Sequence, residues 1–414
     1  MTKAAASADK PPRLKLTPTE RKAGIMLALL FASRMLGLFL LTPVFAVAAQ
    51  AIPGGNDATR VGLALGAYGL TQAIMQIPLG MASDRYGRRA VIVAGMVLFV
   101  VGGVVCALAE NVNWIIAGRI LQGLGAVSAA ITAWVADATR PEVRTRAMAM
   151  VGASIGLSFA ASLVLSPMIV GAFGLSGLFW AISLLGFVCL LIAAFAVPSV
   201  PRQEEDIIQA RARDVLAHAD LLRLNFGVFV LHCVLMALFI VMPGLLAQLG
   251  GYDSGSLWKV YLPVISLSFV AMVPAVFYTE TRRLHKRALE ACVLGMAVVL
   301  ALMPWFTASF SAIFALLVLF FVAFNVLEAL QPSLVSRVAP PAFKGLALGF
   351  YNTSQSLGVF LGGVMGGVMA SRDQGPHVFW VSAVLAALWL LTARGMRQPG
   401  MAHASPEDRR HAPN

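Results

Sequence analysis

The chain has few charged residues for its length. Asp, Glu, Lys and Arg make up 12% of its 414 residues, whereas hydrophobic residues make up 59% and the mean hydropathy is +0.82. A water-soluble domain could not bury so much apolar surface, so we expect lipid to be the main solvent. The sequence also lacks the segments of about ten residues with alternating hydrophobicity that are typical of a membrane barrel.

Cysteines and catalytic motifs are scarce as well. The four cysteines, Cys106, Cys189, Cys233 and Cys292, lie in apolar runs without paired spacing. We interpret them as small hydrophobic residues and expect neither disulfides nor a metal site. The sequence contains no P-loop, no glycine-rich dinucleotide motif after a strand and no Ser-His-Asp set. These absences argue against an enzyme, exclude a self-contained ATP-driven pump and predict no cofactor.

Long apolar runs are abundant. A helix that crosses a bilayer needs about 20 mostly apolar residues, and the sequence therefore predicts an all-α membrane protein with twelve transmembrane helices. The twelve runs cover residues 23–50, 61–83, 90–109, 112–136, 147–172, 176–197, 224–248, 257–278, 288–308, 311–336, 346–370 and 377–394.

Basic residues gather on one side of the predicted membrane. With the N-terminus placed in the cytoplasm, all but five of the 31 Lys and Arg residues are cytoplasmic: Arg60, Lys259 and Arg372 fall outside, and Arg34 and Arg119 fall within the membrane. This is the positive-inside pattern, and it predicts that both termini are cytoplasmic. It also explains the net charge of +12 without a nucleic acid partner. The polar segment before a full-length first run indicates a start-transfer helix rather than a cleaved signal peptide.

The runs divide into two sets of six at the polar stretch 198–223. We predict two pseudo-symmetric six-helix bundles over 23–197 and 224–394, cytoplasmic tails over 1–22 and 395–414, and a surface amphipathic helix in the linker. The two sets repeat at an offset of 200 residues, and small residues at four-residue spacing would let helices approach closely in both. The repeated positions include Ser154, Ser158, Ser162 and Ser166 in one set and Ser354, Gly358, Gly362 and Gly366 in the other.

The segment 80–89 reads GMASDRYGRR and joins the second and third runs. The pattern G-x-x-x-D-R-x-G-R-R between two hydrophobic helices resembles the signature loop of the major facilitator superfamily of transporters. Arg119 with Gln122 resembles the fourth-helix motif of that superfamily. Residues 34–37 and 324–330 resemble its proton-coupled drug-efflux branch, specifically the YajR-type inner-membrane transporters of bacteria. A six-plus-six repeat is typical of such carriers, with the substrate site between the halves.

The resemblance implies that segment 80–89 is part of a cytoplasmic latch, closed when the carrier faces outward and broken when it opens inward. Asp84 would face the N-terminus of the eleventh span, where a carboxylate is stabilised by the helix dipole, and Asp137 would pair with Arg85 or Arg88. In the alternative interpretation these charges only determine the membrane topology. That role would not require an acid at Asp84 or glycines at Gly80 and Gly87. The predicted gating set is Gly80, Asp84, Arg85, Gly87, Arg88, Arg89, Asp137 and Arg144.

Four ionisable residues lie within the apolar runs: Arg34, Arg119, His232 and Glu328. Because a charge in lipid is costly, each is a functional candidate by default. At about 1.5 Å per helical residue, Arg34, His232 and Glu328 lie at a similar depth, roughly 14–18 Å from the cytoplasmic face, and Arg119 lies roughly 27 Å deep. The resemblance implies that the first, fourth, seventh and tenth spans line a central cavity.

Glu328 is the strongest candidate for proton coupling, because it is the only carboxylate well inside a run. Pro332 removes the helical donor to the Glu328 carbonyl and favours a kink there. The alternative is a permanent ion pair between Arg34 and Glu328. His232 is either a second coupling residue or a hydrogen-bonded helix contact. Arg119 matches a motif implicated in proton transfer. In the alternative interpretation it has only a structural role, in packing and hydrogen bonding.

The candidates for the substrate cavity are aromatic or uncharged polar residues: Phe39, Gln72, Gln76, Asn325, Gln331, Tyr351, Asn352 and Gln355. This mixture suits a bulky, mostly apolar ligand that forms a few hydrogen bonds, although helix-packing hydrogen bonds explain the same residues. We therefore predict a monomeric carrier in the inner membrane that exports small amphipathic or drug-like molecules in exchange for protons. The alternatives are a symporter, uniporter or flippase for a specific metabolite or lipid, and a receptor or scaffold that does not transport.

Overall fold

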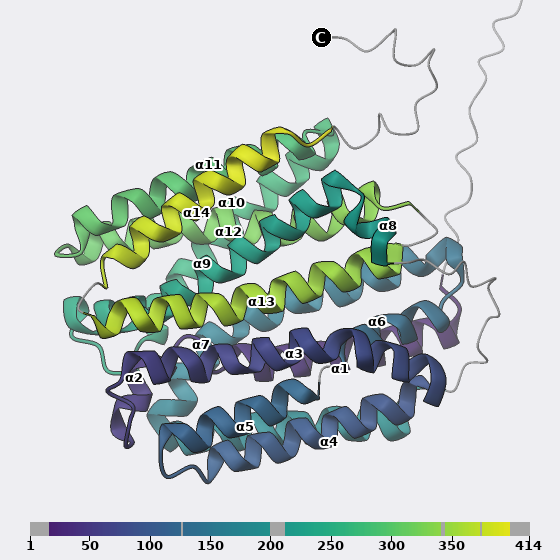
Figure 1. The fold of residues 1–414 in the computed structure, drawn as a ribbon, viewed down its shortest axis with the longest axis horizontal. Coiled ribbons are helices and arrows are strands. Elements are labelled where there is room, and N and C mark those ends of the chain that lie inside the picture. The colour runs from purple at the N-terminus through teal and green to yellow at the C-terminus, as the bar shows by residue number, and fades with distance from the viewer. Residues whose placement is uncertain (1–15, 126, 199–211, 341–343, 373–374, 398–414) are drawn as a thin grey trace, which may run out of the picture.

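The computed structural model describes residues 16–125, 127–198, 212–340, 344–372 and 375–397, and every regular element within these ranges is helical. The long helices lie side by side in one bundle (Figure 1). The prediction of an all-α membrane protein is confirmed.

Helices of the first half of the chain cover most of residues 18–196. They are α1 (Pro18–Phe39), α2 (Phe45–Ala48), α3 (Ala58–Tyr86), α4 (Arg88–Ala107), α5 (Val112–Leu124), α6 (Ser128–Asp137) and α7 (Pro141–Leu191). The second half contains α8 (Ala212–Leu216), α9 (Ala219–Gly250), α10 (Trp258–Arg282), α11 (His285–Leu302), α12 (Phe310–Val338), α13 (Lys344–Ser371) and α14 (His377–Arg394). The amphipathic helix predicted for the linker falls mostly on residues 199–211, outside the described ranges.

These helices account for the twelve predicted spans. Nine helical stretches of the described chain are long and apolar enough to cross a membrane, and one of them, Ser154–Ala196, contains two predicted spans that Gly174 separates with φ 67° and ψ −172°. The remaining two spans are α3 and α13, which are long but less apolar. Both are rich in Gly, Ser and Gln, as expected of helices that pack against other helices rather than lipid.

The first span is shorter than its apolar run. α1 begins with a capping box in which Thr17 accepts from the Glu20 amide and the Glu20 carboxylate accepts from the Thr17 amide. It ends at Phe39, and a turn leads to α2, so the predicted continuous helix over 23–50 is wrong. Pro43 explains the break, because proline supplies no amide hydrogen and disfavours a helical residue before it.

The bundle has two distinguishable ends. We call the end that carries Arg85, Arg88 and Arg89 the basic end and the other the opposite end. Exposed tryptophans, among them Trp114 and Trp305, lie at the opposite end, and exposed tyrosines capped by arginine side chains lie at the basic end. Aromatic residues at both ends are typical of the two interfaces of a membrane-spanning bundle.

The 200-residue repeat is visible in the packing of corresponding helices. The Ser158 and Ser166 hydroxyls on α7 donate to the carbonyls of Ala32 on α1 and of Leu40 directly after it. At the corresponding positions of the second half, glycines of α13 lie directly on the α9 backbone; a Cβ at Gly358 would overlap the Phe229 carbonyl. Small residues therefore bring the fifth span onto the first and the eleventh onto the seventh.

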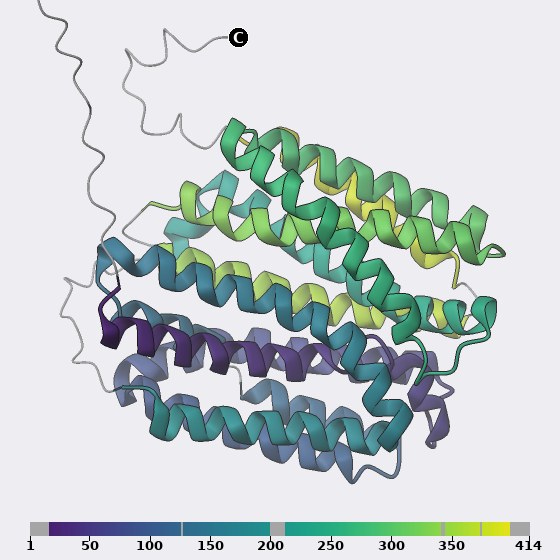
Figure 2. The ribbon, with the colours of Figure 1, turned by 180° about the vertical axis from the view of Figure 1, so that it is seen from behind.

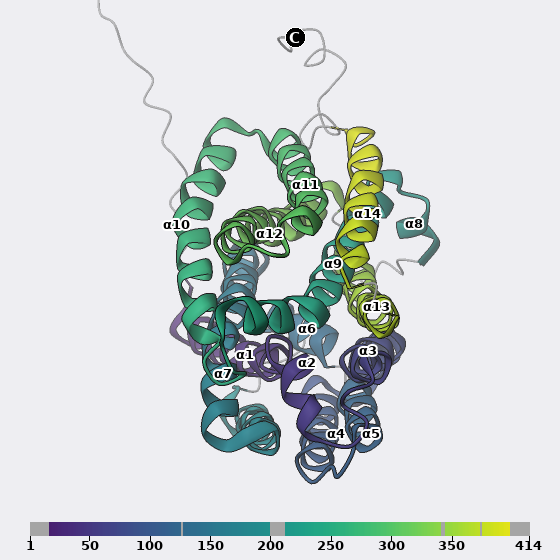
Figure 3. The same ribbon diagram turned by 90° about the vertical axis from the view of Figure 1, so that its left-hand side faces the viewer.

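Two helix pairs join the halves. In Figure 1, α13 lies along α3 between the lower half (α1–α7) and the upper half (α9–α12 and α14). We call this contact the glycine seam, because a Cβ at Gly62 or Gly66 of α3 would overlap the backbone of α13. The second pair, α7 and α10, approaches near the opposite end, where Gly171 of α7 meets Gly255 in the turn before α10, and separates toward the basic end (Figures 2 and 3).

The halves are therefore joined from the middle of the bundle to the opposite end. Near that end the Thr59 hydroxyl donates to the Ser371 hydroxyl at 3.0 Å and the Tyr261 hydroxyl donates to the Pro43 carbonyl at 3.3 Å. At the basic end of α13, by contrast, no atom of the described residues lies within 4 Å of the position that a Cβ would occupy at Gly345 or Gly349.

Candidate functional site

A buried arginine organises the centre of the first half. Arg34 of α1 has no exposed surface. Its Nη1 donates to Ser128 Oγ of α6 at 2.6 Å, and its Nη2 donates to Tyr68 Oη at 2.6 Å and to Gln72 Oε1 at 3.0 Å, both on α3. All three partners are neutral. They solvate the guanidinium without balancing its charge, and an unpaired buried charge costs several kcal/mol.

A second buried arginine lies on the same tyrosine. Arg119 of α5 is 2% exposed, donates from Nη1 to Gln122 Oε1 at 3.0 Å, and holds its guanidinium carbon 4.7 Å from the centre of the Tyr68 ring. Tyr68 thus accepts a hydrogen bond from Arg34 at its hydroxyl and a cation–π contact from Arg119 at its ring face. The Nε atoms of both arginines are buried without a partner among the described residues.

The second half places an acid beside a histidine. His232 Nε2 of α9 lies 3.4 Å from Glu328 Oε1 of α12, and His232 Nδ1 donates to the Val228 carbonyl at 3.1 Å. Gln355 of α13 approaches the same Nε2 at 2.7 Å through its amide nitrogen. The Glu328 side chain keeps 22% of its surface exposed, although its Oε1 is buried without a hydrogen bond.

This arrangement can hold protons in two ways. With Nδ1 donating to the Val228 carbonyl and Nε2 accepting from Gln355, the imidazole is neutral and has no hydrogen to donate to Glu328. If the Gln355 amide turns its oxygen toward His232, a doubly protonated imidazole can donate to Gln355 and to an ionised Glu328. The trio of Glu328, His232 and Gln355 is therefore suited to exchange protons.

A glutamine links the two clusters across the glycine seam. While Gln72 Oε1 accepts from Arg34, its Nε2 donates to Ser356 Oγ of α13 at 2.8 Å. Ser356 follows Gln355, which contacts His232. A series of neighbouring polar residues thus extends from Arg34 in the first half to Glu328 in the second, and it crosses between the halves at the glycine seam.

A cluster of phenylalanines forms another contact between the halves. The Phe159 ring of α7 lies 5.2 Å from Phe39, 6.0 Å from Phe321 and 5.5 Å from Phe324, measured between ring centres. Since Phe39 and Phe159 belong to the first half and the other two rings to the second, the cluster is part of the contact between halves. Phe324 also lies 6.2 Å from the His232 ring.

The structure pairs Glu328 differently from the ion pair considered above. Glu328 contacts His232, whereas Arg34 binds Ser128, Tyr68 and Gln72, so the suggestion of a permanent Arg34–Glu328 pair is wrong in this conformation. The residues lie at similar depth, but depth along a helix does not determine which neighbouring helix a side chain faces.

The remaining cavity candidates are buried or partly buried within the bundle. Asn325 donates to Ser268 at 3.0 Å, and Tyr351 is buried on α13 near Asn352, whose carbonyl accepts from Ser356. The side chains of Gln76 and Gln331 are buried with both amide atoms unpaired. These two are the cavity candidates whose hydrogen-bonding capacity is unused.

Three residues of the predicted gating set, Asp84, Arg88 and Asp137, form a cluster. The Arg88 guanidinium binds Asp84 at 2.6 Å and Asp137 at 2.8 Å, which confirms the predicted contact with Asp137. Gly87 has φ 93°, a conformation that a side chain disfavours, whereas a Cβ at Gly80 would fit at ordinary contact distance from Ala129.

The other predicted gating residues lie around this pair. Arg89 donates to the Val197 carbonyl at 2.6 Å, and Arg85 covers the Tyr86 ring. The side chain of Arg144 lies outside what the structure describes, and the contact of Asp84 with the start of the eleventh span stays a prediction.

The second half has an ion pair of its own at the position that corresponds to Asp137. Glu280 at the end of α10 accepts from Arg337 at 3.0 Å and lies 3.3 Å from His285 Nε2. Arg337 is 200 residues after Asp137, so the acid at one position of the repeat corresponds to a base at the other.

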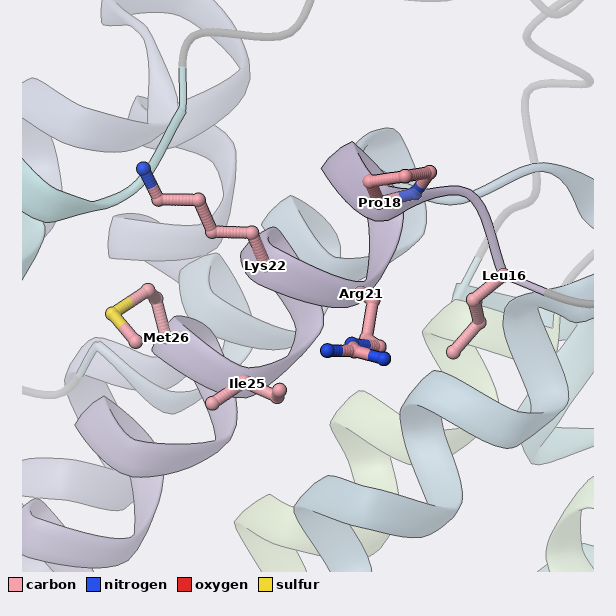
Figure 4. A pocket seen from close by; sticks show the side chains of 6 residues that line it. All are labelled: Leu16, Pro18, Arg21, Lys22, Ile25 and Met26. Atoms are coloured by element: carbon pink, nitrogen blue, oxygen red, sulfur yellow. The ribbon is translucent and has the colours of Figure 1, made fainter.

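One pocket of about 380 Å³ lies away from these clusters, at the basic end beside the start of α1 (Figure 4). No predicted cavity residue is among its lining residues, which are Leu16, Pro18, Arg21, Lys22, Ile25 and Met26. It combines two cationic side chains with apolar ones at the predicted membrane surface.

Sequence reasoning missed Tyr68, Ser128, Ser356 and Phe159. One signal could have found Tyr68: it precedes Gln72 and Gln76 at four-residue spacing, so all three lie on one face of α3. Ser128 and Phe159 stand alone in apolar sequence and gave no comparable signal.

Comparison with known proteins identifies the family. The sequence profile of the Major Facilitator Superfamily matches residues 27–329 and 281–413. The chain belongs to this superfamily. Two relatives and one solved structure illustrate the similarity. The inner membrane transport protein YajR of Escherichia coli (strain K12) is 42% identical over 390 residues, which cover 93% of this chain and 85% of that protein.

The multidrug resistance protein MdtH of Aeromonas salmonicida (strain A449) is 27% identical over 384 residues, which cover 90% of this chain and 95% of MdtH. The crystal structure of a D-xylose-proton symporter has the same fold, with a TM-score of 0.74 at 17% sequence identity over 91% of this chain and 98% of the symporter. The predicted membership in the superfamily and the resemblance to YajR are confirmed. The protein is a membrane transporter of the Major Facilitator Superfamily, whose members bind small-molecule substrates within the membrane.

Proposed function

We propose that this major facilitator protein exports small amphipathic molecules in exchange for protons. The observation that carries the proposal is the trio of Glu328, His232 and Gln355, which contains two titratable groups and adjoins the seam through Ser356, the chain neighbour of Gln355. Alternating access parts such seams, so the groups beside them change environment during transport. A carboxyl group that alternates between environments binds and releases a proton.

The transporter lies in the bacterial inner membrane with the basic end and both termini in the cytoplasm. The distribution of Lys and Arg supports this orientation, and YajR carries the printed name of an inner membrane transport protein. With this orientation, a bundle joined at the opposite end and separated at the basic end corresponds to the inward-facing conformation. MdtH is named a multidrug resistance protein, which supports amphipathic, drug-like substrates.

Arg88 and its neighbours gate the cytoplasmic side. In the inward-facing conformation Arg88 binds Asp84 and Asp137 within the first half. When the basic ends of the two halves come together, Asp84 lies beside the first turn of α13, where the helix dipole stabilises a carboxylate. The latch therefore forms in the outward-facing state and breaks in the inward-facing state.

Flux measurements in proteoliposomes test the proton coupling. Two dyes of opposite charge, ethidium and carboxyfluorescein, are followed under an imposed pH gradient, so that the assay does not depend on the sign of the substrate. We expect the gradient to drive flux of at least one dye, and Glu328→Gln to reduce that flux to the level of empty liposomes. Glu290→Gln is the matched control, because Glu290 lies on α11 and pairs with Lys286 at 3.7 Å, away from the seam. Gradient-driven flux that survives in Glu328→Gln would reject Glu328 as the coupling acid.

A further inference from the structure

Two uncompensated positive charges lie in the centre of the first half. Arg34 and Arg119 are both almost fully buried and both contact Tyr68. Among the described residues neither has a carboxylate within ion-pair distance, and arginine does not lose its proton inside proteins. The centre of this half therefore carries a charge of +2 that the protein itself does not neutralise.

The same region has hydrogen-bond donors that are not used. Within the described parts of the chain the Nε groups of Arg34 and Arg119 have no partner, and neither atom of the Gln76 amide has one, although Gln76 is only 1% exposed. Buried polar groups normally find partners, so each such group requires an explanation. A planar anion with several acceptor oxygens would satisfy both the charge and the donors, since guanidinium groups bind carboxylates and related anions in a bidentate manner.

The position of this cluster fits a substrate site. Gln72 binds Arg34 on one side and Ser356 of the other half on the other side, so separation of α3 from α13 frees an edge of the arginine cluster. The rings of Phe39 and Phe159 provide apolar surface between the halves. A molecule with an aromatic or aliphatic body and one anionic group would place its body against these rings and its charge on Arg34.

We infer that the transported molecules are amphipathic organic anions, carboxylates or sulfonates, whose negative group is bound by Arg34 with Arg119 behind it. This inference rests on the proposed transport function and specifies its substrate class. It also divides the chemistry between the halves. Glu328, already paired with His232, carries the proton and is not the counter-ion of Arg34.

A thermal-shift screen of the purified full-length protein in detergent tests the inference. The panel consists of aryl and alkyl carboxylates and sulfonates, each with its neutral amide and its trimethylammonium analogue. We expect at least one anion to raise the unfolding temperature while its neutral and cationic analogues do not. Arg34→Gln should abolish the shift, whereas Arg372→Gln, which removes an exposed arginine beyond the end of α13, should retain it.

Three results would overturn the inference: no anion in the panel stabilises the protein, a cationic analogue stabilises it more than its anion, or the anion shift survives Arg34→Gln. Loss of the shift in Glu328→Gln would also overturn it, because the anion would then lie at the proton site. If Arg34→Gln does not fold, Arg34→Lys keeps the charge but not the bidentate geometry, and we expect roughly tenfold weaker binding. Proton coupling can fail in the flux assay while anion binding persists in the thermal-shift screen. Anion binding can equally fail while proton coupling persists, so the two proposals are distinguishable.

Discussion

The two halves of this transporter share a scaffold and differ in their chemistry. Helices at an offset of 200 residues pack in the same way, α7 on α1 and α13 on α9. The ionisable groups buried at the centre of each half do not repeat, although the buried acids Glu20 and Asp220 at the basic end do. The first half holds Arg34 and Arg119 among neutral partners, and the second half holds Glu328 beside His232. The two halves therefore share the packing of the repeat and differ in the charge at their centres.

The contacts between the halves differ as well. The glycine seam joins α3 and α13 from Thr59 at one end to Gln72 in the middle, whereas α7 and α10 meet closely at Gly171 and Gly255. A long backbone contact resists separation more than a local one. This difference predicts that α7 and α10 separate more readily than α3 and α13 when the halves move apart.

The largest effect in this comparison is expected from filling the seam. Gly62→Leu would drive a side chain into the Gly363 carbonyl and should cost about 1–3 kcal/mol or more of stability, the range for overpacking. Gly295→Leu is the matched control, because nothing lies within 4 Å of its Cβ position. Gly171→Leu at the shorter contact should fall between the two. Thermal unfolding in detergent measures all three, and equal losses for Gly62 and Gly171 would contradict the difference between the contacts.

A smaller effect is expected from exchanging charges at the basic end. Glu280→Arg or Arg337→Glu alone should lower the free energy of unfolding by roughly 0.2–1 kcal/mol, as for exposed ion pairs. The double variant, which exchanges the two charges, should regain most of that loss. In the first half, the double variant that exchanges Arg88 and Asp137 should not regain the lost stability, because an acid at position 88 would face Asp84. A double-mutant cycle measures both couplings, and equal recovery in the two halves would show that Asp84 does not distinguish them.

The sequence predicted the elements better than the contacts. Length and hydropathy were sufficient for twelve spans, and the charge pattern of segment 80–89 predicted that Asp137 pairs with Arg85 or Arg88. The length of the first span was overestimated, because an apolar run continues through Pro43 although a helix does not. Where propensity and hydrophobicity disagree at a proline, backbone geometry decides the end of the helix.

The partners of the buried charges could not be predicted in the same way. Counting residues from the membrane surface placed Arg34 and Glu328 at similar depth, but the rotation of each helix decided that Arg34 faces Tyr68 and that Glu328 faces His232. A single apolar helix presents no clear polar face, so its rotation depends on packing with neighbours distant in sequence. Ser128 and Phe159 were missed for the same reason.

The central claim is that the first half binds the negative charge of the substrate and the second half carries the proton. The most direct test is exchange of the best-binding panel anion across proteoliposome membranes at equal pH on both sides, where no proton gradient is needed. We predict that Glu328→Gln exchanges the anion at the wild-type rate and fails only to accumulate it under a pH gradient, whereas Arg34→Gln loses exchange altogether. Loss of exchange in both variants, or retention in Arg34→Gln, would contradict this division.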